Sequence, residues 1–314
     1  MSAPGSLRSR VDAPLLLPVA TFVILLGAIF WLQPRTMSYF GLNLMLNLAV
    51  PLALATIAQM MFLTINDLDL SIGSFVGLVA CITATWLHDR PWLGALALLG
   101  CIAGYAAVGA LVQWRQLPAI VVTLGMSFVW LGLAILLLPS PGGNSPDWLA
   151  SFVGYHMPLV PLPIVACVVI GLFTHVLMMR TSFGVVLRGM GGFARAVERA
   201  GWSALRARMT LYALAGCFGV LSGLALVGLT TSADANIAQR YTLLSVAGAI
   251  LGGCSFFGGR IAPIGTVIGA LTLALASSAL TFLHLGADWQ VGAQGAILIA
   301  VLALRALTGR EREA

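Results

Sequence analysis

Long apolar runs constrain this sequence more than any other feature. Of its 314 residues, 60% are hydrophobic and 8% are charged, whereas a soluble domain carries about a quarter charged residues. The apolar residues gather in ten stretches, most of roughly twenty residues, the length at which a helix crosses a bilayer. We therefore predict an all-α polytopic membrane protein with about ten transmembrane helices. The predicted spans are Leu15–Leu32, Leu42–Leu63, Ile72–Trp86, Leu93–Trp114, Ala119–Leu138, Leu162–Met179, Met209–Leu229, Tyr241–Phe257, Ile261–Leu283 and Trp289–Leu307.

The arginines predict the orientation of the chain. The sequence contains no lysine, and with both termini in the cytoplasm thirteen arginines fall inside and three outside, as the positive-inside rule requires. The chain then consists of a cytoplasmic tail (1–14), a single transmembrane domain (15–307) and a second cytoplasmic tail (308–314). Because the arginines gather on the predicted cytoplasmic side, membrane topology accounts for the net positive charge. The charge therefore does not indicate nucleic-acid binding. The first span is long enough to be the core of a signal peptide, but the residues that follow it, Gln33-Pro34-Arg35, do not form a signal-peptide cleavage site. We therefore expect the first span to remain uncleaved, as a transmembrane helix.

Two of the predicted spans, Ile72–Trp86 and Tyr241–Phe257, are short. They fall below the roughly twenty residues that a helix needs to cross a bilayer, so each is a candidate for a broken or re-entrant span. An offset of five helices also reverses the direction of the chain, so spans two to five and seven to ten can form inverted repeats. The two halves show no convincing sequence match, and the repeat remains a hypothesis.

A polar stretch, Asp67-Leu68-Asp69-Leu70-Ser71-Ile72-Gly73-Ser74, separates the second and third spans. Carboxylates and hydroxyls are costly in lipid unless they face protein, water or a partner. One interpretation is local, with Asp and Ser capping the next helix. The other is functional, with these groups beside a transport path. The two interpretations are compatible.

The predicted inner loop, 180–208, carries six arginines and a potential short helix. Gly191-Gly192 breaks the chain before it, and Gly201 stands at a helix-stop position. On this helix Phe193, Ala196, Val197 and Ala200 share one face, opposite Arg195, Glu198 and Arg199. Such a face fits a protein partner or the surface of the membrane equally well.

Four blocks of sequence follow one another in a fixed order. They are Leu68–Ser74, Pro118–Met126, the run from Phe183 to Gly201, and Gly252–Arg260 followed by Gly265, Thr266 and Gly269. In this order and spacing they resemble the permease subunits of bacterial ATP-binding-cassette (ABC) importers for sugars of the ribose, xylose, arabinose and galactoside type. The resemblance covers about Asn43 to Leu307.

The resemblance implies a permease in the bacterial inner membrane that works by alternating access. It also implies three partners: an ABC ATPase subunit, a periplasmic substrate-binding protein and a second permease subunit of the same or another kind. We expect this chain to catalyse no reaction and to bind no cofactor, since it has no G-x-x-x-x-G-K-[ST] loop and ATP is used by the partner. The expected substrate is a pentose or hexose.

The sequence departs from the family pattern at two places. Asn66-Asp67 stands where these permeases commonly have Gly-Gly, and Gly192-Phe193 stands where they commonly have Gly-Asn. The first departure adds a carboxylate beside the expected path and leaves the kind of sugar open. A related branch of permeases carries branched-chain amino acids, which remains an alternative substrate class, as do other small polar solutes.

Candidate site residues fall into two groups. A neutral polyol needs weakly polar groups along its path, although the same groups often bridge helices in lipid. For the substrate path we predict Asn47, Gln59, Asp69, Ser71, Thr123 and Ser255. For coupling to the ATPase we predict Phe193, Ala196, Val197, Glu198, Ala200 and Gly201.

Two other kinds of protein fit the sequence less well. An ion-coupled secondary carrier needs ionisable groups in mid-span, and Asp67 and Asp69 lie at a span end. An intramembrane enzyme is suggested only by Ser255 and His284, without a G-x-S-x-G motif or an acidic partner. The five cysteines and four histidines lack ligand spacing, so we expect no metal site.

Overall fold

The computed structural model describes residues 13–255, 259–282, 292, 295, 296 and 299, and every regular element among them is a helix. The predicted all-α class is therefore confirmed. The elements are α1 (Ala13–Leu32), η1 (Pro34–Met37), α2 (Tyr39–Leu46), α3 (Ala49–Thr64), α4 (Ile72–Ile82), η2 (Thr83–Leu87), α5 (Pro91–Arg115), α6 (Ala119–Leu137), α7 (Asp147–Val153), α8 (Leu162–His175), η3 (Val176–Arg180), α9 (Ser182–Arg199), α10 (Ala204–Thr230), α11 (Tyr241–Leu251) and α12 (Pro263–Phe282).

Six helical stretches among the described residues are long and apolar enough to cross a membrane, and three further apolar helices are shorter. The three shorter helices are Pro18–Leu32, Ile72–Leu87 and Tyr241–Leu251. The predicted tenth span, 289–307, lies outside the described residues apart from isolated positions. The long stretches are Tyr39–Thr64, Pro91–Arg115, Ala119–Leu137, Leu162–Arg180, Ala204–Thr230 and Pro263–Thr281.

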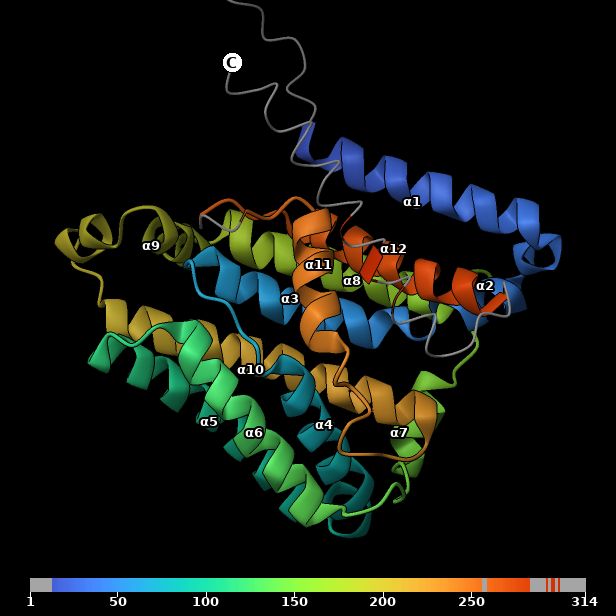
Figure 1. The fold of residues 1–314 in the computed structure, drawn as a ribbon, viewed down its shortest axis with the longest axis horizontal. Helices are drawn as coiled ribbons and strands as arrows, with labels where there is room; N and C mark the ends of the chain where they lie inside the picture. Colours follow the sequence, from blue (N-terminus) through green and yellow to red (C-terminus); the bar gives the residue numbers. More distant parts are fainter. Residues whose placement is uncertain (1–12, 256–258, 283–291, 293–294, 297–298, 300–314) are drawn as a thin grey trace, which may run out of the picture.

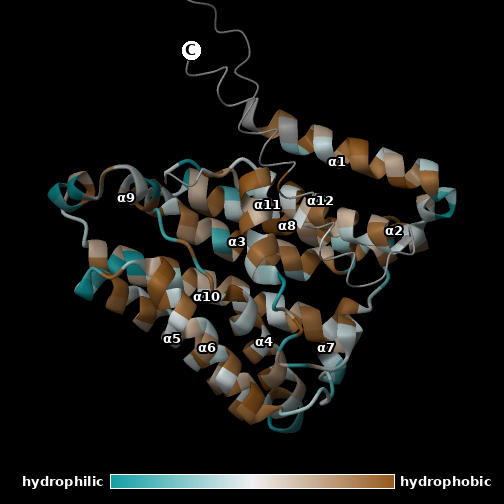
Figure 2. Cartoon of the chain, viewed as in Figure 1, coloured by the Kyte–Doolittle hydropathy of each residue, from teal (hydrophilic) through white to brown (hydrophobic). Residues whose placement is uncertain are grey.

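The helices form a bundle around α3 and α10 (Figure 1). Helix α10 packs against α5 and α4, and α3 packs against α11 and α12, while α3 and α10 also contact each other. Helix α9 lies at one end of the bundle and α7 at the other, and we call these the α9 end and the α7 end. Hydrophilic residues gather at the α9 end, whereas the outer helices carry apolar residues along their length (Figure 2).

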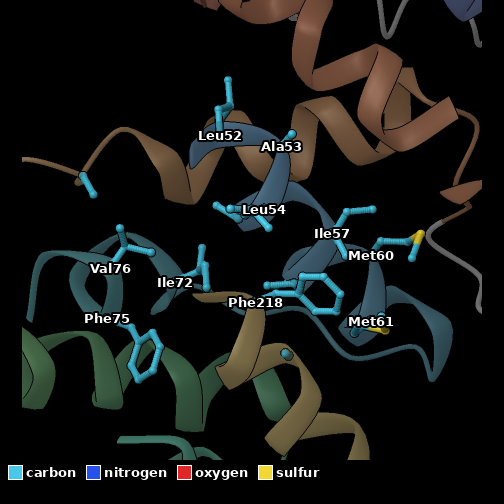
Figure 3. Close-up of a cluster of buried hydrophobic side chains, with 14 of the residues drawn as sticks. Leu52, Ala53, Leu54, Ile57, Met60, Met61, Ile72, Phe75, Val76 and Phe218 are labelled. Atoms are coloured by element: carbon cyan, nitrogen blue, oxygen red, sulfur yellow. The ribbon is translucent and has the colours of Figure 1, made fainter. Parts of the chain in front are cut away.

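Helix α3 is almost entirely buried in the bundle. All but one of its residues are buried, and Ala53, Ala55 and Ala58 are fully enclosed. Small residues let neighbouring helices approach closely in a membrane bundle, and larger side chains such as Ile57, Met61 and Phe218 fill the remaining space (Figure 3). The core therefore surrounds the helix that leads directly into the polar stretch.

The two short predicted spans form short helices, and each follows a break in helical structure. Residues 65–71 are non-helical before α4, and residues 231–240 are largely non-helical before α11. The second segment passes beside α4, because a Cβ atom on Gly77 would overlap the carbonyl oxygen of Ala235. The starts of α4 and α11 then meet, where the backbone N–H of Gly73 donates to Thr242 Oγ1 at 3.1 Å. The two breaks thus lie next to each other inside the bundle.

Candidate functional site

Asp69 is the centre of a buried hydrogen-bond cluster in the segment 65–71. Its side chain is fully buried, and its Oδ1 atom accepts from the backbone N–H and the hydroxyl of Ser71, both at 2.7 Å. The hydroxyl of Tyr105, on α5, donates to Oδ2 at 2.6 Å. A buried carboxylate is tolerated only when such donors replace water. Asp69 therefore joins the start of α4 to the middle of α5.

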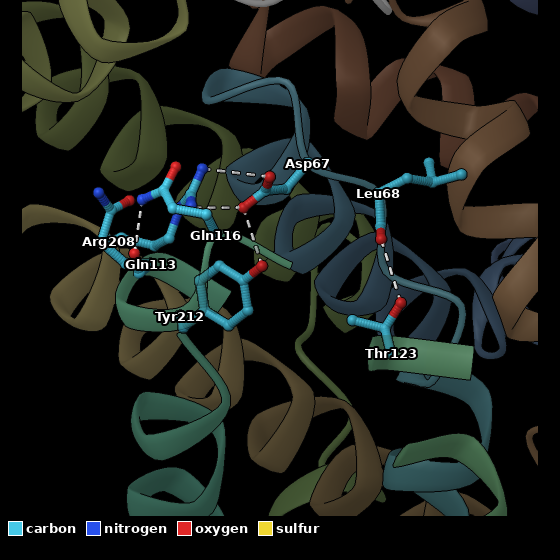
Figure 4. A network of polar contacts seen from close by, with 7 residues as sticks. All are labelled: Asp67, Leu68, Gln113, Gln116, Thr123, Arg208 and Tyr212. Carbon is cyan, nitrogen blue, oxygen red and sulfur yellow. Dashed lines mark hydrogen bonds and ion pairs between the residues drawn. The ribbon is translucent and has the colours of Figure 1, made fainter. Parts of the chain in front are cut away.

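Gln59 and Thr123 hold the backbone of the same segment. In the amide orientation that satisfies both partners, Gln59 donates to the backbone carbonyl of Asp69 at 3.0 Å and accepts from its N–H at 3.2 Å. Thr123 Oγ1, on α6, accepts from the N–H of Leu70 at 3.1 Å and donates to the carbonyl of Leu68 at 3.2 Å (Figure 4). These side chains supply the hydrogen bonds that a regular helix would otherwise make.

Four of the six predicted path residues thus converge at one place: Gln59, Asp69, Ser71 and Thr123. The other two lie elsewhere. Asn47 is half-buried at the turn between α2 and α3, at the opposite end of α3 from Asp69. Ser255 follows α11, where its backbone N–H donates to the carbonyl of Arg260 at 3.1 Å.

Asp67 belongs to a second cluster, closer to the α9 end. Its Oδ2 atom lies 3.3 Å from Arg208 Nε and accepts from the Tyr212 hydroxyl at 2.8 Å (Figure 4). Asp67 and Arg208 also line a cavity of about 310 Å³, together with Asn66, Leu68 and residues 116–120. Sequence reasoning did not identify Tyr212. The available signal was the spacing of Arg208 and Tyr212, which places both on one face of a helix.

Aromatic rings pack against Tyr105 and Tyr212, the two tyrosines that bind the carboxylates. Sequence reasoning missed this feature as well. The rings of Phe62 and Tyr212 meet edge to face at 4.6 Å between centroids, and those of Phe75 and Tyr105 at 4.3 Å. Trp130 stacks on Tyr105 at 6.1 Å. Edge-to-face and stacked pairs add to the stability of a core beyond the area they bury. These rings keep the tyrosine hydroxyls aimed at Asp67 and Asp69.

The predicted coupling helix occupies the second half of α9. The chain leaves helical geometry at Phe193 (φ −144°, ψ 77°), one residue later than the expected break at Gly191-Gly192. Gly191 stays helical because it is packed against Thr64, where a Cβ atom would overlap the carbonyl oxygen. The break therefore falls after the packed glycine, at Phe193, whose side chain is 80% exposed.

The helix ends as the sequence predicts. Gly201 has φ +88°, its N–H donates to the carbonyl of Glu198 at 2.9 Å, and the N–H of Trp202 donates to that of Val197 at 3.2 Å. This pair of bonds is the Schellman motif. Ala196, Glu198 and Ala200 are exposed, while Val197 is half-buried and lies close to Gly189. The exposed part of the predicted face lies at the outer surface of the α9 end.

The glycine pair allows a matched test of this packing. We expect Gly191→Ala to destabilise the protein by about 1–3 kcal/mol, because an added methyl group there overpacks a filled site. Gly192→Ala is the control, since nothing lies within 4 Å of its Cβ position. Thermal unfolding of both variants in one detergent measures the difference. Equal melting temperatures would contradict the close approach of α9 to α3.

Comparisons with protein families and with individual proteins identify the same class of protein. The model of the family described as "Branched-chain amino acid transport system / permease component" matches residues 41–302. The autoinducer 2 import system permease LsrC of Shigella flexneri is 30% identical over 86% of this chain and 78% of its own length. The LsrC proteins of Salmonella typhi and of Yersinia pestis strain Pestoides F are each 27% identical over 94% of this chain, and over 86% and 85% of their own lengths. No solved structure matches the chain.

These matches confirm the predicted resemblance to permeases of sugar-type ABC importers. With several apolar helices in the described part of the chain, they indicate a multi-pass protein of the inner membrane. The matched residues include the polar stretch, α9 and the α11–α12 connection. The chain therefore belongs to the family of branched-chain amino acid transport system permease components.

Proposed function

We propose that this permease forms the translocation path of an ATP-driven importer for a small, neutral, polyhydroxylated solute. The observation that carries this proposal is the similarity to the autoinducer 2 import permeases over 86–94% of the chain, within a permease family matched over residues 41–302. The importer would consist of this chain, a second permease subunit, an ABC ATPase and a periplasmic binding protein. We also propose ten spans, with the α9 end and both termini in the cytoplasm, because the arginine-rich segment 180–208 lies at that end.

We propose that the ATPase docks on the helix Phe193–Ala200. This helix lies at the α9 end, and Phe193, Ala196 and Ala200 are exposed on it. A partner surface accounts for an exposed aromatic side chain on a short amphipathic helix. The break at Phe193 lets the helix move relative to the first half of α9. Force from the ATPase would then enter the bundle through Gly191 and α3.

The residues around Asp69 favour a neutral substrate. In the described part of the chain, both buried carboxylates already have partners: Asp67 pairs with Arg208, and Asp69 accepts from Ser71 and Tyr105. Asp69 also occupies the positive end of α4, which could otherwise receive a substrate carboxylate. We therefore propose that Gln59, Asp69, Ser71 and Thr123 hold the wall of the path in shape.

We propose that the fold contains inverted repeats that rock against each other. Two observations support this. Helices α3 and α10 have matching neighbours, α11 and α12 for α3, and α4 and α5 for α10. Each proposed repeat also contains one short helix that follows a non-helical segment, and the starts of these helices, α4 and α11, meet. Interrupted helices in opposed repeats are a common basis for alternating access.

Uptake of radiolabelled solutes tests the substrate class. The chain would be expressed with its ATPase and binding protein in cells that lack the transport system, and tested with pentoses, hexoses, autoinducer 2 and leucine. Autoinducer 2 is included because the LsrC relatives are named for its import, and leucine because the family is described by branched-chain amino acids. We expect competition among polyhydroxylated solutes and none from leucine. Uptake of leucine alone would contradict the proposal.

A further inference from the structure

Asn66 lies where the polar segment begins, and its backbone is in the left-handed region with φ 64°. This conformation is unfavourable for most residues but is tolerated by glycine and, less readily, by asparagine. A glycine would fit the backbone without strain. The chain instead carries an amide side chain at this position.

The amide of Asn66 reaches α9. Its Nδ2 atom donates to the backbone carbonyl of Gly191 at 2.9 Å, across 125 residues of sequence. Gly191 lies two residues before the break at Phe193, and carbonyl groups next to a helix break need partners from outside the helix. Asn66 therefore binds the first half of α9 just before the break at Phe193. The exposed helix 193–200 follows this break, which we call the hinge.

The same position is tied into the bundle on its other side. Asp67 follows directly and binds Arg208 and Tyr212 of α10, and two residues later Asp69 binds Tyr105 of α5. The carbonyl of Thr64, just before this segment, accepts from the N–H of Gly259 at 3.0 Å. A displacement of Gly191 would thus be passed to a segment that is attached to three other parts of the bundle: α10, α5 and the residues around Gly259.

We propose that Asn66 is a positioning residue for energy coupling: its hydrogen bond to Gly191 transmits movement of the α9 helix to the segment that precedes α4. The inference rests on the proposed ATP-driven function. It differs from a purely structural role, because the bond joins the last turn of α9 before the break at Phe193 to the segment 65–71. Its loss should leave the fold intact and separate ATP hydrolysis from transport.

The decisive variant is Asn66→Gly. Glycine adopts the same backbone conformation at lower cost, so the variant removes the amide without disturbing the turn. The matched control is Gln116→Gly. Gln116 is also left-handed (φ 52°) and lines the same cavity, but its amide donates only to Gln113 of its own helix, at 2.6 Å. Asn66→Asp is the second variant, because aspartate tolerates this backbone but its ionised side chain cannot donate.

The measurement is the number of ATP molecules hydrolysed per solute transported, in vesicles containing the complete importer. We expect this number to rise about fivefold in Asn66→Gly and Asn66→Asp, the size expected when one hydrogen bond is lost. Melting temperature and ATPase recovery should match the wild type, and Gln116→Gly should behave as the wild type throughout.

The other outcomes overturn the proposal in distinguishable ways. A wild-type ratio in both Asn66 variants, or a rise in Asn66→Gly alone, would show that the hydrogen bond transmits nothing. A lower melting temperature in both variants with an unchanged ratio of ATP hydrolysed to solute transported would show that Asn66 acts only on stability. If the wild-type complex itself transports without ATP, the proposed function fails, and the coupling role of Asn66 fails with it.

Discussion

The Ala196→Glu variant is expected to insert normally and to lose nearly all ATP-driven uptake. Ala196 is exposed on the α9 helix between Phe193 and Ala200, so a longer charged side chain is accommodated in the free protein. At a protein interface the same side chain would bring an uncompensated charge and steric overlap, which commonly costs several kcal/mol. Uptake should therefore fall at least a hundredfold, while membrane yield stays unchanged.

Two further variants complete this test, one conservative and one that reverses a charge. Ala196→Ser keeps the side chain small and should transport at close to the wild-type rate. Glu198→Arg reverses a charge on the opposite, polar side of the same helix and should also uncouple transport. Membrane fractionation, thermal unfolding and uptake would be measured on all three. Wild-type uptake in both Ala196→Glu and Glu198→Arg would exclude this helix as the ATPase docking site.

Replacing Asp69 by asparagine is expected to reduce uptake about tenfold or more. The change swaps one acceptor oxygen for an NH₂ group among three donors, in a site that is fully buried. Hydrogen bonds to a charged group contribute about 1.5–3 kcal/mol, and buried donors left unpaired add to the loss. The segment before α4 would loosen, and its hydrogen bond to Tyr105 of α5 would be weakened.

Asp67→Asn is the matched comparison for this variant. Asp67 accepts at the edge of a cavity of about 310 Å³, and water there can replace a weakened contact with Arg208. We expect its effect on uptake to be about twofold. Uptake rates of the two variants, normalised to the amount of inserted protein, test this order. A larger loss in Asp67→Asn would mean that the Asp69 cluster does not hold the path in shape.

Much of the fold could be predicted because lipid imposes simple patterns on sequence. Apolar runs of sufficient length predicted the helices of the described spans, and the two shortest runs correspond to the short helices Ile72–Leu87 and Tyr241–Leu251. The stop at Gly201 followed from local backbone chemistry alone. Each of these features is determined by neighbouring residues.

The arrangement of the site could not be predicted in the same way. Tyr105, Trp130 and Tyr212 look like ordinary apolar residues of their spans, and only the packing of α5, α6 and α10 brings them to the two carboxylates. The pairing of Asp67 with Arg208 joins residues 141 positions apart. Hydrophobic periodicity identifies a helix but does not say which helices are neighbours. Asn66 could be seen as a departure from a family pattern, but not as a contact to Gly191.

The most direct test of the proposed function is to identify the proteins that co-purify with this permease. A tagged copy would be isolated from its own membranes in mild detergent, and the recovered proteins identified by mass spectrometry. We expect the wild-type permease to recover a cytoplasmic protein with a phosphate-binding G-x-x-x-x-G-K-[ST] loop. We expect the Ala196→Glu variant not to recover this protein. A permease that purifies alone and still catalyses uptake into vesicles without ATP would contradict the account, and an ion-coupled carrier would take its place.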